Sequence, residues 1–222
     1  MRRLRLLVLV YGITAIGSPA AARDQITPEL AAYQNMTLAR VRPGAKAIFY
    51  HDIEVDGCPA QTARCQRRAY IIGGDLVLSG PTKGNLVKAA YNDRGGRPTE
   101  GWILRSLVEP VPVPHPTRSA WLGDWTYDEA SIDITAGTRP GRIKASGIAT
   151  WGMHDPERVK IGGINTGDFE DEASITGDRV LFGDADDDGC RVSMRLIGPY
   201  LVVADNGDCG GLNVTFSGFY RR

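Results

Sequence analysis

The side chains in this chain best suited to chemistry are carboxylates gathered in short segments next to glycine. The run Asp184-Ala-Asp-Asp-Asp-Gly189 has the D-x-D-x-D-G order that opens one type of calcium-binding loop. Such a loop needs a bidentate carboxylate at its twelfth position, where this chain has Arg195. We therefore expect no metal ion here and interpret the run as a solvated hairpin turn, with weak surface binding of calcium as the alternative.

A second acidic segment, Asp205-Asn-Gly-Asp208, follows soon after the first. Cys190 and Cys209 stand next to the two segments, so a bond between these cysteines brings both segments to one end of the domain. Repulsion within such a group of carboxylates favours a bound cation or a basic partner. We expect an acidic rim that binds a partner, with Asp184, Asp186, Asp187, Asp188, Asp205 and Asp208 as its members.

No combination of residues in the sequence points to catalysis. The histidines, His51, His115 and His154, fit no recognisable arrangement with serine or cysteine, and G-x-S-x-G is absent. We expect a protein that is not an enzyme and uses no cofactor.

Aromatic and basic side chains in the first half offer a different kind of site. Tyr50 and Tyr91 are candidates to line a ligand groove, and the basic stretch that contains Arg67 and Arg68 is a candidate to flank it. The alternatives are core packing for the two tyrosines and a solvated loop for the two arginines.

The N-terminus has the three parts of a secretory signal: arginines at positions 2, 3 and 5, an apolar run over 6–16, and small residues at 20–22. The apolar run is too short to span a bilayer, which needs about 20 residues as helix. We expect a signal peptide over residues 1–22 and a mature periplasmic or secreted protein without stable membrane insertion. An uncleaved anchor is the alternative.

An exported chain with four cysteines predicts a disulfide framework. Three connectivities are possible. We favour Cys58–Cys65 and Cys190–Cys209, because each bond then closes a loop within one domain. Neither pair has the C-x-x-C spacing of a redox-active dithiol.

Prolines at alternate positions predict an extended spacer over residues 110–118. Residues 23–109, before it, contain short apolar segments at 45–51, 68–72, 75–78, 86–91 and 101–104, separated by glycine turns, with a helix expected only within 28–39. Residues 119–222, after it, show period-2 alternation, as in Val192, Met194 and Leu196. We predict an all-β protein with a small N-terminal barrel and a C-terminal antiparallel barrel or sandwich of seven or eight strands.

Residues 40–110 resemble the bacterial SH3-like domain. The resemblance is carried by Gly74-Asp75-x-Val77, by the strand that ends at Tyr91 and by Gly101-Trp102. It implies a small barrel that binds peptidoglycan or peptides, or serves as a spacer. Residues 119–222 are similar to lipocalins in Gly123-x-Trp125 and the closing Arg221-Arg222. This resemblance implies a barrel in which the first-strand Trp packs beneath an Arg of the last strand.

The two halves differ in charge. Residues 23–113 have a net charge of +3 and residues 114–222 a net charge of −6. The near-zero total argues against nucleic acid as a partner. We expect an exported, non-enzymatic binding module that contacts cell-wall material such as peptidoglycan, or an extracytoplasmic protein. The alternative is a periplasmic inhibitor or immunity-type protein that blocks a basic hydrolase, such as lysozyme, with an acidic rim of loops.

Overall fold

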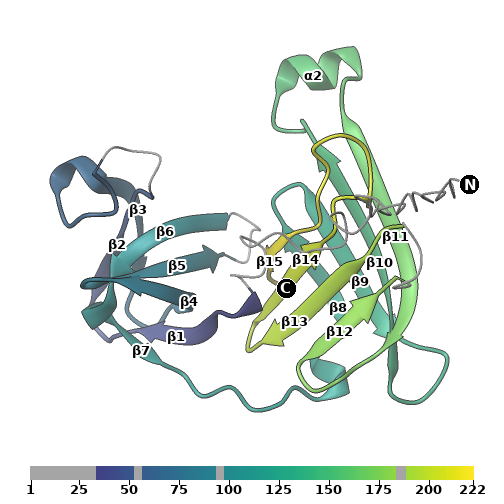
Figure 1. Cartoon of the computed structure of the whole chain (residues 1–222), viewed down its shortest axis with the longest axis horizontal. Helices are drawn as coiled ribbons and strands as arrows, with labels where there is room; N and C mark the ends of the chain where they lie inside the picture. The colour runs from purple at the N-terminus through teal and green to yellow at the C-terminus, as the bar shows by residue number, and fades with distance from the viewer. Residues whose placement is uncertain (1–33, 53–56, 94–97, 184–188) are drawn as a thin grey trace, which may run out of the picture.

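The computed structural model describes residues 34–52, 57–93, 98–183 and 189–222. In these ranges the chain is built from antiparallel β-strands with one short α-helix, so the predicted all-β fold class is confirmed. Figure 1 shows two units, a first unit on the left and a second unit on the right. The expected signal peptide, residues 1–22, lies outside the described residues.

The first unit is a seven-stranded sheet with the order β3-β2-β6-β5-β4-β1-β7. Apolar side chains on its inner face, such as Phe49, Val77 and Ile103, form one core. The predicted glycine turn at Gly84-Asn85 joins β4 to β5, with Gly84 in the left-handed region at φ 59°. The strands are β1 (Thr37–Val41), β2 (Lys46–Tyr50), β3 (Gln66–Ile72), β4 (Leu76–Lys83), β5 (Leu86–Asn92), β6 (Pro98–Leu104) and β7 (Val108–Pro110).

The second unit consists of two four-stranded sheets with the orders β11-β10-β9-β8 and β12-β13-β14-β15. Thr126 and Arg221 exchange backbone hydrogen bonds of 2.8 and 3.1 Å, which link β8 to the end of β15. The strands are β8 (Gly123–Tyr127), β9 (Ala130–Ala136), β10 (Arg142–Trp151), β11 (Asn165–Ser174), β12 (Arg179–Phe182), β13 (Val192–Ile197), β14 (Tyr200–Asp205) and β15 (Gly218–Tyr220). The helix α2 (Pro156–Ile161) lies between β10 and β11, and short 3₁₀ turns occur at η2 (Ala63–Cys65), η3 (Arg105–Leu107) and η4 (Arg118–Ala120).

The period-2 pattern of the second unit places its apolar residues between the two sheets. Val192, Met194 and Leu196 are buried there, together with large aromatic side chains such as Trp125 and Phe216. The guanidinium of Arg222 lies 4.6 Å from the centre of the Trp125 ring, and its Nη1 donates to the carbonyl of Leu122 at 2.9 Å. An arginine after the last strand therefore covers the tryptophan of the first strand.

Both disulfides form as predicted. Cys58 bonds Cys65 in the first unit, and Cys190 bonds Cys209 in the second. Disulfides persist in oxidising compartments, so the pairing indicates an extracytoplasmic location.

The expected spacer begins as part of the first sheet. Pro110 ends β7, an edge strand where a missing N–H is tolerated, and the N–H of Val111 still donates to the carbonyl of Leu38. The sequence pattern also missed β1: Thr37–Val41 pairs with β4 and β7, although a helix was expected within 28–39. In a helix, the backbone N–H and C=O groups of residues 37–39 would bond within the helix. Here they bond to the neighbouring strands instead.

The two units share an apolar interface. Met36, Leu38 and Leu78 of the first unit pack against Tyr200 and Phe219 of the second. The Tyr200 hydroxyl also donates to the carbonyl of Leu76 at 2.7 Å. The units are therefore joined by buried surface as well as by the chain between them.

Candidate functional site

One end of the second unit, here called the loop end, gathers three connections between strands. They are the turn at Asp128-Glu129 between β8 and β9, residues 152–164 with α2, and residues 206–217 between β14 and β15. In Figure 1 this end lies at the top, where α2 projects from the sheets beside the yellow 206–217 segment. The 206–217 segment contacts the start of β11, which follows the α2 connection, because the N–H of Gly211 donates to the carbonyl of Thr166 at 3.0 Å.

Asp205 holds the 206–217 segment in place from inside. Its side chain is 3% exposed, and its carboxylate accepts hydrogen bonds from the N–H groups of Gly207 and Phe216 and from the hydroxyls of Thr215 and Ser217. The predicted place of Asp205 on an exposed acidic rim is therefore wrong. Its charge is used to satisfy donors of the loop that follows β14.

The Cys190–Cys209 disulfide fixes the same segment to the connection before β13. Asn206 adds two bonds across the two connections: its side-chain amide donates to the carbonyl of Gly189 at 2.9 Å, and its side-chain oxygen accepts from the N–H of Arg191 at 3.0 Å. The predicted proximity of these connections is correct. Of the predicted rim, Asp208 is exposed here, whereas Asp184, Asp186, Asp187 and Asp188 lie outside the described residues.

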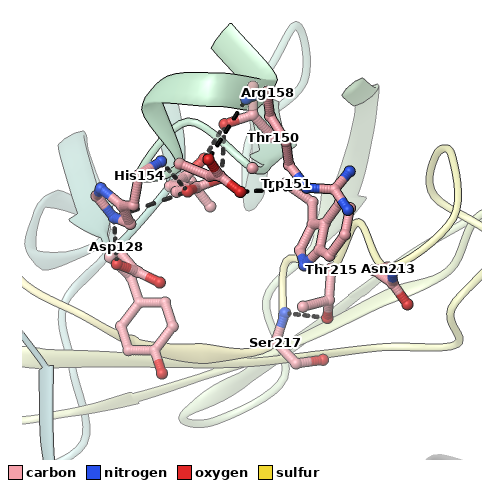
Figure 2. Close-up of a pocket in the computed structure, with 13 residues that line it drawn as sticks. Asp128, Thr150, Trp151, His154, Arg158, Asn213, Thr215 and Ser217 are labelled. Carbon is pink, nitrogen blue, oxygen red and sulfur yellow. Dashed lines mark hydrogen bonds and ion pairs between the residues drawn. The ribbon is translucent and has the colours of Figure 1, made fainter. Parts of the chain in front are cut away.

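A cavity of about 450 Å³ opens at the loop end (Figure 2). Its volume falls in the range of small-molecule and side-chain pockets. Its walls combine carboxylates, hydroxyls, an amide, a guanidinium and two aromatic rings. The lining residues are Tyr127, Asp128, Glu129, Ala130, Thr150, Trp151, Gly152, His154, Asp155, Arg158, Asn213, Thr215 and Ser217.

His154 and the two carboxylates of the β8–β9 turn form one side of the cavity. The His154 ring Nε2 lies 2.9 Å from a carboxylate oxygen of Asp128, and the His154 backbone N–H donates to Glu129 at 2.9 Å (Figure 2). Burial by itself would raise the pKa of the Glu129 carboxyl. The pKa nevertheless lies below its usual value, because the carboxylate is stabilised by backbone hydrogen bonds from His154 and Met153, by the nearby imidazole and by the Thr150 hydroxyl. Glu129 is therefore ionised at neutral pH.

Trp151 and Arg158 form the other side. The Arg158 guanidinium lies 4.1 Å from the centre of the Trp151 ring, and its Nε lies 3.7 Å from a carboxylate oxygen of Asp155. Asp155 also caps α2 by accepting from the N–H groups of Glu157 and Arg158, and Pro156 occupies the first helical position. The cap thus sets the position of Arg158 in the wall.

Two cavity residues have unusual backbone. Asp128 and Asn213 have φ values of 47° and 66°, and they are the non-glycine residues of the described ranges with positive φ. Asp and Asn adopt this conformation more readily than other side chains, at some cost in energy. Both therefore present their polar groups from tight, well-defined turns.

Exposed apolar side chains lie on the same connections that line the cavity. Ile161 on α2 is 77% exposed and Leu212 is 79% exposed, and Met153 and Val159 are also exposed. The side-chain amide of Asn165 donates to the Leu212 carbonyl, which ties this residue to β11. Exposed apolar side chains gathered at one end of a protein are typical of a binding surface.

Among the described residues, the four side chains predicted to line a ligand groove in the first unit have different surroundings. Tyr50 is 4% exposed and packs with the Cys58–Cys65 disulfide, so its expected surface role is wrong. Tyr91 is partly buried and lines a separate cavity of about 350 Å³ between the units, with Arg221 on its other wall. Arg67 donates to the carbonyl of Glu100, and Arg68 is exposed on β3.

Comparison with models of protein families, with curated proteins and with solved structures found no match. Among the described residues, no group of three or more His, Cys, Asp or Glu side chains is arranged to hold a metal ion. The same residues contain no helix that is long and apolar enough to span a membrane.

Proposed function

We propose that this chain is an exported, non-catalytic binding protein, and that the loop end of its second unit binds a protein partner with a basic surface. The observation that carries the proposal is that Ile161 and Leu212, exposed and apolar, lie on the connections that line a cavity with three carboxylates. Apolar residues contribute the area that a protein interface buries, and the charged groups select the partner.

The anchoring of the loop end supports the proposal. The buried Asp205 carboxylate, the Cys190–Cys209 bond and the Asp155 cap each hold one part of the surface in a single arrangement. A surface that is ordered before binding loses less conformational entropy when its partner docks. Such anchoring therefore favours a specific contact.

Charge supports a basic partner. Residues 114–222 have a net charge of −6, and a field of one sign speeds association with a partner of the opposite sign. The contact between Arg222 and Trp125 agrees with the lipocalin-like resemblance of this unit. A basic hydrolase blocked by this unit is the partner class that we favour over cell-wall material, because Tyr50, which was expected to line a groove in the first unit, is buried.

Site-specific photo-cross-linking in the exported protein tests the proposal. A photoreactive phenylalanine analogue is placed at Leu212 in one variant and at Ile72, which is also exposed and apolar, in another. We expect a protein cross-link from position 212 and none from position 72. Sedimentation of the unmodified protein with purified peptidoglycan, together with no cross-link from position 212, would favour the cell-wall function instead.

A further inference from the structure

We propose that the loop-end cavity receives one cationic side chain of the partner, a guanidinium or an ammonium group. This inference rests on the proposed function, and it assigns a ligand chemistry to the cavity itself. The cavity is large enough for one extended side chain, at about 450 Å³, and the connections that line it also carry the exposed apolar residues that a partner would cover.

The charges of the wall favour a cation. The positive charge of Arg158 is balanced by the negative charge of Asp155, whose carboxylate oxygen lies 3.7 Å from its Nε. With histidine counted as neutral, the carboxylates of Asp128 and Glu129 then give the lining a net negative charge. The Glu129 side chain is only 12% exposed, so solvent screens its charge less than it screens a surface carboxylate.

The acceptors are fixed before any ligand binds. Glu129 accepts from the His154 backbone and from the Thr150 hydroxyl, and the His154 ring in turn contacts Asp128 at 2.9 Å. The left-handed turn at Asp128 sets the direction of that side chain. Asp128 is therefore held at the mouth of the cavity, half-exposed, with its carboxylate available to a donor from outside.

The opposite wall already binds a guanidinium. The Arg158 guanidinium lies on the face of the Trp151 indole and near the Asp155 carboxylate. This wall therefore has the aromatic and acidic groups that bind a planar cation. Asn213 adds a side-chain carbonyl oxygen to the lining, which can accept a hydrogen bond from an N–H donor (Figure 2). Thr215 and Ser217 also line the cavity, with hydroxyls that are already bonded to Asp205.

The test uses small probes and NMR amide and indole signals of the full mature chain. The probes are the acetylated methylamides of arginine, lysine and citrulline, the last being an uncharged analogue of arginine. A single side chain without its protein binds weakly, so titrations extend to about 50 mM probe. Two variants are compared with the natural chain. Asp128→Asn removes the charge from the cavity but keeps a residue that tolerates positive φ. Asp133→Asn is the control, which removes one carboxylate charge from the outer face of β9.

We expect the arginine probe, the lysine probe or both to shift the Trp151 indole signal and the amides of residues 128, 129 and 154. Citrulline should bind about tenfold more weakly or not at all, and Asp128→Asn should weaken the cationic probes about tenfold while Asp133→Asn leaves them unchanged. Equal shifts with citrulline, shifts located elsewhere, or no shifts would overturn the cation site. Cross-linking from position 212 remains a separate readout, so the partner surface can stand if the cation site fails.

Discussion

At the scale of single residues, the aspartates of the second unit divide into structural and surface groups. Asp205 is buried and accepts four hydrogen bonds, whereas Asp208, three positions later, is exposed. The sequence presents both in the same polar segment next to glycine. Burial of one carboxylate depends on the path of residues 206–217, which the local pattern does not encode.

Asp205→Asn should lower the free energy of unfolding by about 2–3 kcal/mol, because the amide cannot accept from all four donors and the buried N–H of Phe216 loses its charged acceptor. Urea unfolding measures the change. Asp208→Asn is the matched control and should shift stability by less than about 0.5 kcal/mol. Equal stability of the two variants would show that Asp205 does not anchor the loop.

The burial of Glu100 predicts that the stability of the protein depends on pH. Burial raises the pKa of this carboxyl to about 7, so the folded state favours its protonated form. Its stabilising contribution is complete below the unfolded pKa, near 4.5, and is lost as pH rises through 7. Relative to Glu100→Gln, the natural chain should lose about 2 kcal/mol of unfolding free energy between pH 5 and pH 8. Urea titrations at both pH values check this, and parallel pH profiles for the two proteins would contradict it.

The cavity residues show why a site can escape sequence reading. His154 matches no catalytic motif, and its neighbours Asp128 and Glu129 are far away in the chain. Only the pairing of β8, β9 and β10 brings these residues together. One local signal was available, since Asp155-Pro156 has the order of a helix cap followed by proline at the first helical position.

At the scale of elements, β14 and β11 shape the second unit. All of β14 is buried, because one face meets the core of the second unit and the other meets the first unit. The alternating pattern of β13 could be recognised in the sequence. The continuous apolar run of β14 follows from its contact with the first unit in addition to the core of its own unit.

Gly167 in β11 lets the 206–217 segment approach, since a Cβ there would overlap the carbonyl of Cys209 and the Cα of Gly210.

Gly167→Ala should destabilise the protein by about 1–3 kcal/mol and displace the 206–217 segment, because both overlapping atoms belong to the backbone. Thermal unfolding and the amide signals of residues 209–212 report the two effects. Gly163→Ala is the control, since its Cβ would make ordinary contacts of 3.4 Å with Ile161. A fully stable Gly167→Ala protein would mean that the segment adjusts at little cost.

At the scale of the whole molecule, the interface between the units decides how the chain behaves. Two β-units and the region between them were predictable from proline and glycine positions. The interface was not, because Leu38, Leu78, Tyr200 and Phe219 look like ordinary core residues of their own units. Asn92 reinforces the contact from a fully buried position by donating to the carbonyls of Thr126 and Phe219.

We expect the natural chain to unfold in one calorimetric transition, since the apolar contact couples the two units. Val202→Asp places a charge in that contact and should separate the transition into two while lowering stability by about 3 kcal/mol or more. Leu181→Asp, at an exposed position on β12, should change stability by about 0.5 kcal/mol or less. Two transitions in the natural chain would contradict the coupling.

If the loop end binds the protein partner, the affinity for that partner depends on the exposed apolar side chains of the loop end. The partner recovered by cross-linking is titrated against three proteins: the natural chain, Ile161→Ser/Leu212→Ser, and Tyr70→Ser/Ile72→Ser, which removes two exposed apolar side chains from the first unit. We predict that the loop-end variant binds at least about tenfold more weakly and that the first-unit variant binds as the natural chain does. Unchanged affinity of the loop-end variant, with loss of affinity in the first-unit variant, would show that the partner does not bind at the loop end.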